Sequence, residues 1–205
     1  MVALMEKTDQ VEVEMMKLKI GFYLLLLAAT FSMSSCVGRS VEPSANPIEL
    51  IANTSFEAGG QPSATGWSAL HGSLPTLDSN FFSTDVPPGG GLYSIKLFPG
   101  WLPMENAVEY DCAGQPSGVY KLSAWSKIGW GTRMGISSIS LARKSNGIFD
   151  RKKLLLSDSV WTQHALVDTL SLGPSDTLEV ILSAGATELV SFEQLFDLVS
   201  LTKVQ

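Results

Sequence analysis

Positive charge is scarce in this chain of 205 residues, which has 14 lysines and arginines against 20 aspartates and glutamates. The formal net charge at pH 7 is therefore −6. Nucleic-acid binding requires a basic surface that neutralises phosphates, so this balance argues against DNA and RNA as partners. The length suits one ordinary domain, with or without a processed segment.

A long apolar run is also missing. The strongest run, residues 20–31, is uncharged but spans only about a dozen residues, whereas a membrane-crossing helix needs about 20. Two lysines precede this run and small residues follow it, which is the pattern of a secretory signal. Residues 1–14 are acidic, although a signal carries positive charge at its front. We therefore expect translation to begin at Met15 or Met16.

The end of this signal, "FSMSSCVG", resembles the lipobox of bacterial lipoproteins, with Met33 where leucine is usual. The resemblance implies that residues 1–36 are a signal segment and that Cys36 is the lipidated first residue of the mature protein. The chain would then be anchored in the bilayer of the bacterial cell envelope, facing outside the cytoplasm. An ordinary signal cleaved nearby is the alternative. Residues 37–47 are predicted to be a tether and residues 48–205 the domain.

Cysteine is scarce in the chain, with two residues in all. If Cys36 is lipidated, only Cys112 remains, and no disulfide can form within the mature chain. The neighbouring Asp111 and Glu109 would raise the pKa of this thiol. Cys112 is therefore predicted to be a buried apolar residue rather than a reactive one.

Helical periodicity is absent from residue 48 onward. Short runs rich in β-branched and aromatic residues alternate with Gly, Pro, Ser and Asp turns, which is typical of an all-β domain. A domain of this size has room for a two-sheet antiparallel β-sandwich with a core. The strands are predicted at residues 48–53, 66–70, 91–98, 106–112, 118–127, 133–142, 149–156, 160–169, 176–184 and 195–204.

Alternation along these strands predicts which side chains face inward, because successive residues of a strand point to opposite faces. The predicted inward sets are Tyr120, Leu122 and Ala124 in one strand and Trp161, Ala165 and Val167 in another. Trp67 is also expected in the core. Trp125 and Lys121 fall on the polar face of their strand.

Five motifs occur in a familiar order. They are "NTSFEAGG" with a following Gly-Trp, "GLYSIKL", "GVYKLSAWSK", "VWTQHAL" and "LFDLVSLTKV". Together they resemble the galactose-binding-like β-jelly-roll of many carbohydrate-binding modules, over essentially all of residues 48–205. The resemblance implies a jelly-roll sandwich that binds a poly- or oligosaccharide.

The resemblance also implies a structural calcium ion, held by the Glu of the first motif and the Asp of the last. The matching residues are Glu57 and Asp197. Ca²⁺ takes about six to eight oxygens, and an aspartate between two apolar residues is costly to bury without a partner. Relatives often carry a further acidic or amide residue where Leu198 stands, so one ligand is lost here. The alternative is that Glu57 caps a turn and Asp197 accepts backbone hydrogen bonds without a metal.

Tryptophans are the candidate sugar-binding residues, because aromatic faces stack on pyranose rings. Trp125 leads, with Lys121 beside it on the polar face. Trp101 and Trp130 lie in turn-like segments where exposure is expected. Partial packing into the core is the alternative for each tryptophan.

Signatures of catalysis are lacking. The two histidines are far apart, and there is no G-x-S-x-G, H-E-x-x-H or Cys/His metal spacing. Glu105, Glu109 and Asp111 could supply the paired carboxylates of a glycoside hydrolase, or they could form a solvated edge. The prediction is a non-catalytic, lipid-anchored binding module of the cell envelope that binds glycans. The alternative is a structural or protein-interaction adaptor.

Overall fold

The computed structural model describes residues 47–70, 79–99, 105–131, 135–146, 148–186 and 192–204. They belong to one compact unit, Asn46–Gln205. Cys36, Trp101 and the apolar run of the signal lie outside the described residues. Within the described ranges, none of the helical segments is long and apolar enough to span a membrane.

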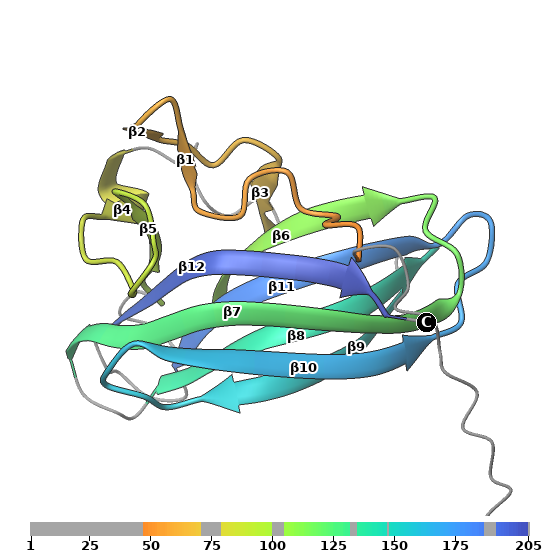
Figure 1. Cartoon of the computed structure of the whole chain (residues 1–205). Coiled ribbons are helices and arrows are strands. Elements are labelled where there is room, and N and C mark those ends of the chain that lie inside the picture. Colours follow the sequence, from red (N-terminus) through yellow and green to blue (C-terminus); the bar gives the residue numbers. More distant parts are fainter. Residues whose placement is uncertain are drawn as a thin grey trace, which may run out of the picture. The chain divides into compact units, whose positions relative to one another are not determined.

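Two five-stranded antiparallel sheets form a sandwich, as Figure 1 shows. The predicted all-β, two-sheet antiparallel architecture is therefore confirmed. The front sheet of Figure 1 contains, in order, β10 (Thr162–Leu170), β7 (Gly118–Gly131), β12 (Phe192–Lys203), β5 (Ser94–Leu97) and β4 (Phe82–Ser83).

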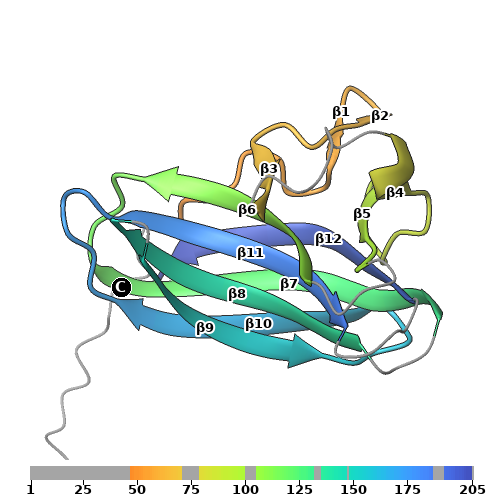
Figure 2. The same ribbon diagram turned by 180° about the vertical axis from the view of Figure 1, so that it is seen from behind.

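The back sheet comes to the fore in Figure 2. It contains, in order, β3 (Trp67–Ala69), β6 (Glu105–Ala113), β11 (Thr177–Ala186), β8 (Gly135–Ser145) and β9 (Ile148–Leu156). A two-stranded hairpin, β1 (Glu57–Ala58) and β2 (Gln61–Pro62), and a 3-10 turn, η2 (Ser79–Phe81), complete the described elements.

The core lies between the two sheets and is built from alternate residues of each strand. Tyr120, Leu122 and Ala124 of β7 are fully buried, as predicted. Leu178 and Val180 of β11 meet them from the back sheet within the same apolar cluster. Each large apolar side chain removed from water in this way contributes about 1.5–3 kcal/mol, so the sandwich is held chiefly by this layer.

Cys112 of β6 also belongs to the core, with 5% of its surface exposed. Burial raises the pKa of its thiol to about 12, with Asp111 and Glu49 adding to the rise. The prediction that Cys112 is buried in the core is confirmed.

The first predicted strand, 48–53, is wrong. This segment makes one isolated bridge, Glu49 with Thr202, and its next backbone hydrogen bond runs from Leu50 N to Leu201 O. The carboxylate of Glu49 then accepts hydrogen bonds from the amides of Ile51 (2.9 Å) and Leu201 (2.8 Å). A side chain thus takes the place of the backbone ladder. The short strands β1, β2 and β4 carry no readable alternation and were not predicted.

The inward face predicted for β10 is also wrong. Leu166 and Leu170 are buried, whereas Val167 is 48% exposed and Ala165 is exposed. β10 is an edge strand, and its pairing with β7 places Leu166 opposite the buried Leu122. Paired residues share a face, and a shift of one residue moves every side chain to the other face. Pairing with β7 therefore outweighed the apolar pattern of β10 itself.

Candidate functional site

The turn that carries Glu57 is organised by the side chain of Asn53. Its Nδ2 donates to Ser63 O at 2.8 Å, and its Oδ1 accepts from the Glu57 amide at 3.2 Å. Phe56, directly before Glu57, adopts a left-handed backbone conformation with φ of 53°, and its ring is fully buried. The buried ring and the Asn53 amide together fix where the chain enters β1, and so where Glu57 lies.

Asp197 lies at a bulge in β12, where the register with β7 shifts between Asp197 and Ser200. The bulge includes Leu198, whose φ is 47°, and the Leu198 amide donates to Asp197 Oδ1 at 2.7 Å. The next amide, that of Val199, donates to Thr54 O at 2.8 Å. The bulge therefore joins the closing strand to the loop that leads to Glu57.

Glu57 and Asp197 lie against the same pair of glycines. A Cβ on Gly90 would stand 2.6 Å from Asp197 Oδ2, and a Cβ on Gly91 would stand 1.5 Å from Glu57 Oε1. The amide of Leu92 donates to Glu57 Oε2 at 2.9 Å. A Cβ at either position would displace the carboxylate that lies there, so the backbone of Gly90 and Gly91 approaches both side chains closely.

The surroundings of this carboxylate pair favour the protonated form of Asp197. Asp197 is fully buried, and burial together with the nearby Glu57 raises its pKa to about 7, although the Leu198 amide opposes the rise. Asp197 Oδ2 is buried and has no hydrogen-bond partner within the part of the chain that the structure describes. Among the described residues, no lysine, arginine or histidine lies within ion-pair distance of either carboxylate.

This arrangement fits a hard divalent cation. A buried carboxylate with a free oxygen, close to a second carboxylate and without a basic partner, is unfavourable unless it is protonated or binds a metal. Ca²⁺ prefers oxygen ligands of this kind. Glu57 and Asp197 are thus the side chains that would hold the ion.

Two of the three tryptophans predicted to bind sugar, Trp125 and Trp130, lie on β7. Trp125 is half-buried and pairs with Gln163 on one side and Asp197 on the other, so it shares their face of the front sheet. Lys121 is exposed on the same strand. Trp130, near the end of β7, is 59% exposed. Trp101 lies outside the described residues.

Trp161 is not a core residue, contrary to the prediction. It is half-buried just before β10, and its Nε1 donates to Asp85 Oδ1 at 2.8 Å. The Lys127 ammonium lies 5.7 Å from the centroid of its ring and forms an ion pair with Asp85. Burial alone would raise the pKa of Asp85, but the hydrogen bonds from Lys127 and Trp161 lower it below its usual value. Trp67, in contrast, is buried as predicted.

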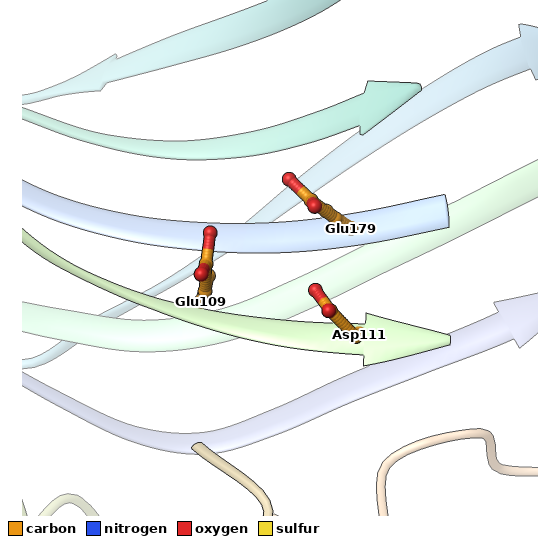
Figure 3. A group of neighbouring side chains, drawn as sticks. All are labelled: Glu109, Asp111 and Glu179. Atoms are coloured by element: carbon orange, nitrogen blue, oxygen red, sulfur yellow. The ribbon is translucent and has the colours of Figure 1, made fainter. Parts of the chain in front are cut away.

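A second group of carboxylates lies on the back sheet, where Glu109 and Asp111 of β6 meet Glu179 of β11 (Figure 3). One oxygen from each lies within 4.8 Å of the others. Glu179 is fully buried, which raises its pKa even though Lys144 Nζ, 2.8 Å from Glu179 Oε1, lowers it. Glu179 therefore has a basic partner within this group, which neither Glu57 nor Asp197 has among the described residues.

Sequence reasoning grouped Glu105 with Glu109 and Asp111, but Glu105 is engaged elsewhere. Its carboxylate lies 3.4 Å from Arg151 Nη2 and 3.4 Å from Lys153 Nζ. Glu179 was missed, because it joins the group only through the pairing of β11 with β6. One indication of Glu179 was present in the sequence: this residue alternates with the apolar residues of its strand and so lies on the opposite face.

Comparison with known proteins places the fold. No protein-family model matches the chain. No curated protein matches it either. Among solved structures, the CBM22-1 xylan-binding domain of Xyn10C from Paenibacillus barcinonensis is similar, with a TM-score of 0.51 and 14% identity over 78% of this chain and 96% of that one. This chain has the β-sandwich fold of carbohydrate-binding modules. At this identity the likeness concerns the fold alone.

Parts of two larger enzymes have the same fold. An arabinose-bound α-L-arabinofuranosidase, MgGH51, matches with a TM-score of 0.53 and 16% identity over 75% of this chain. The enzymatically active domain of tailspike protein 4 of bacteriophage CBA120 matches with a TM-score of 0.54 and 14% identity over 77%. The match covers only 26% and 22% of those chains, so it concerns one part of each.

Proposed function

We propose that this chain is a non-catalytic glycan-binding module, anchored in the bacterial cell envelope by a lipid on Cys36 and facing outside the cytoplasm. The observation that carries the glycan-binding proposal is the exposure of tryptophan along β7, in a sandwich of the carbohydrate-binding-module fold. Trp130 is 59% exposed, and Trp125 is half-buried on the outer face. Labelling cells with a tagged fatty acid tests the lipid anchor. We expect the wild-type chain to incorporate the label and Cys36→Ser to lose it. Equal labelling of the two chains would contradict the anchor.

Indole rings at a sheet surface suit sugars because they present a large, rigid apolar face with little conformational entropy to lose. Lys121, exposed on the same strand, adds a donor for sugar hydroxyls. The xylan-binding domain with the same fold supports a polysaccharide as the ligand class.

We also infer that Glu57 and Asp197 bind a structural calcium ion. The free buried Oδ2 of Asp197 and the absence of a basic partner among the described residues support this assignment. When bound, the ion neutralises both carboxylates. It would then hold together the first loop, the 87–91 turn and β12.

Affinity electrophoresis of the full chain in mild detergent, in gels containing xylan, galactan or other soluble polysaccharides, tests glycan binding. We expect retardation by at least one polysaccharide and a loss of affinity of about tenfold in Trp130→Ala, since an exposed stacking face is removed. Phe149→Ala is the matched control, because Phe149 is an exposed aromatic residue of β9 on the other sheet.

Two outcomes would contradict the proposal. If no polysaccharide retards the wild-type chain, glycan binding is wrong and the adaptor function becomes the better explanation. If Phe149→Ala weakens binding as much as Trp130→Ala, the β7 surface is not the binding site.

A further inference from the structure

We propose that a cavity between the edge strands β9 and β10 binds the carboxylate of an acidic sugar. This inference rests on the proposed glycan-binding function and names a ligand class for it. The site is separate from the tryptophans of β7, from the carboxylate pair at Glu57 and from the acidic cluster of Figure 3.

The cavity has a volume of about 460 Å³, within the usual range for ligand pockets. It opens where the edges of the two sheets come together, since β9 ends the back sheet and β10 ends the front sheet (Figures 1 and 2). β8 contributes Arg143, β9 contributes residues 150–152, and residues 168–171 close the other side. Both sheets therefore supply polar groups to one cavity.

Arg143 is the main anion-binding group. Its Nη1 donates to Ser171 O at 3.3 Å, while its Nη2 is 3.8 Å from Asp150 Oδ2, too far for a strong hydrogen bond. The Nε atom is buried and has no acceptor among the described residues. Because the buried Nε is closed to a ligand, the Nη atoms are the donors that can meet a carboxylate, and their fixed fork matches its two oxygens.

The remaining charged groups suit a sugar better than a bare anion. Lys152 Nζ donates to Val167 O at 3.0 Å and to Asp168 Oδ1 at 3.2 Å, so it is fixed at the cavity wall. Arg143 and Lys152 pair with Asp150 and Asp168 there, whereas the Nη2 of Arg151, a further lining residue, lies 3.4 Å from Glu105 Oε2. The aspartates would repel a doubly charged phosphate but can accept hydrogen bonds from sugar hydroxyls. A uronic acid supplies one carboxylate and several hydroxyls.

Isothermal titration of the full chain in mild detergent tests the site, with trigalacturonate, neutral galactotriose and inorganic phosphate as probes at matched ionic strength. We expect trigalacturonate to bind more tightly than the other two. Arg143→Lys, which keeps the charge but removes the fork, should weaken trigalacturonate binding about tenfold. Lys152→Gln should weaken it as well.

Lys153→Gln is the matched control, because this neighbour carries the same charge but points to the other face of β9, toward Glu105. Equal losses in Lys152→Gln and Lys153→Gln would show a general charge effect and overturn the inference. Binding of phosphate as tightly as trigalacturonate would overturn the assignment to a sugar.

The two proposals fail in different ways. If polysaccharides bind through Trp130 but trigalacturonate binds no better than galactotriose, glycan binding stands and the acidic-sugar site is wrong. If trigalacturonate binds and Arg143→Lys weakens it, the cavity is supported even when Trp130→Ala has no effect. Thermal unfolding of each variant verifies that it is folded.

Discussion

The two groups of carboxylates in this protein differ in the groups that balance their negative charge. On the back sheet, the buried Glu179 lies 2.8 Å from Lys144 Nζ, and hydrogen bonding to Glu179 raises the pKa of that lysine. On the front sheet, the equally buried Asp197 has only the amide of Leu198 as a hydrogen-bond partner among the described residues, with Glu57 nearby. Each of these two acids keeps a buried oxygen without a hydrogen-bond partner, but within the described ranges only Glu179 has a basic side chain beside it.

This difference supports the proposal that Glu57 and Asp197, rather than the cluster on the back sheet, bind a cation. A buried carboxylate without a counter-charge must bind a proton or a cation, whereas an ion-paired one need not. The larger cluster, three acids, is therefore the weaker candidate for a metal, and the smaller pair is the stronger one. The number of acidic side chains matters less than the presence of a basic partner.

The largest effect is expected from calcium. If Glu57 and Asp197 bind Ca²⁺, chelation with EDTA should lower the melting temperature. At a calcium concentration about 100 times the dissociation constant, the bound ion adds about 2.7 kcal/mol to the free energy of unfolding. Differential scanning calorimetry with EDTA and with excess Ca²⁺ measures the shift.

The matched control for this experiment is Glu179→Gln, which alters the compensated cluster and should leave the calcium shift unchanged. Gly91→Ala, whose Cβ would displace Glu57, should abolish it. If EDTA does not change the melting temperature of the wild-type chain, the proposal that Glu57 and Asp197 bind calcium is wrong.

Removal of the compensating lysine should have the next largest effect. Lys144→Met keeps the apolar stem but leaves Glu179 buried beside Glu109 and Asp111 with no ammonium group. Since Lys144 is 36% exposed, we expect a loss of about 2 kcal/mol, below the value for a fully buried pair. The midpoint of urea unfolding measures it.

Lys153→Met provides the comparison, because Lys153 is equally exposed but pairs with the exposed Glu105. Surface pairs contribute about 0–1 kcal/mol, so this variant should be nearly as stable as the wild type. Equal destabilisation by the two substitutions would mean that Lys144 does not compensate the cluster.

Per pH unit, the smallest effect is expected in the pH dependence of the EDTA-treated protein. The folded-state pKa of Asp197, about 7, lies above its ordinary value of 3.8, so the folded state binds a proton that the unfolded state does not. The free energy of unfolding should therefore rise as pH falls from about 7 to about 4, by up to about 1.4 kcal/mol per pH unit from this group.

Asp197→Asn should remove this dependence, because an amide does not titrate. Urea unfolding at several pH values, with EDTA present throughout, measures the difference between wild type and variant. Parallel pH profiles would show that Asp197 does not titrate in this range.

Particular residues show how far sequence reasoning reached. The inward set of β7 was predicted because a central strand with a strict alternation carries its own register. The inward-facing residues of β10 were predicted wrongly, because this edge strand takes its register from its pairing with β7. Trp161 was placed in the core because it is apolar, but Asp85 and Lys127 hold it at the surface. The segment 48–53 has strand-like composition, yet the carboxylate of Glu49 interrupts its ladder.

The sequence by itself determined the all-β class, the alternation of β7 and the burial of Cys112, because these follow from local composition and period. It also pointed to Glu57 and Asp197, through motifs at opposite ends of the domain. Only the tertiary structure decided that Gly90 and Gly91 closely approach both carboxylates, that Glu179 joins Glu109 and Asp111, and that Arg143 faces a cavity shared by two sheets. Burial, pKa and charge compensation depend on which strands pair and which edges meet, and these contacts join residues too far apart in the sequence for any local pattern to specify.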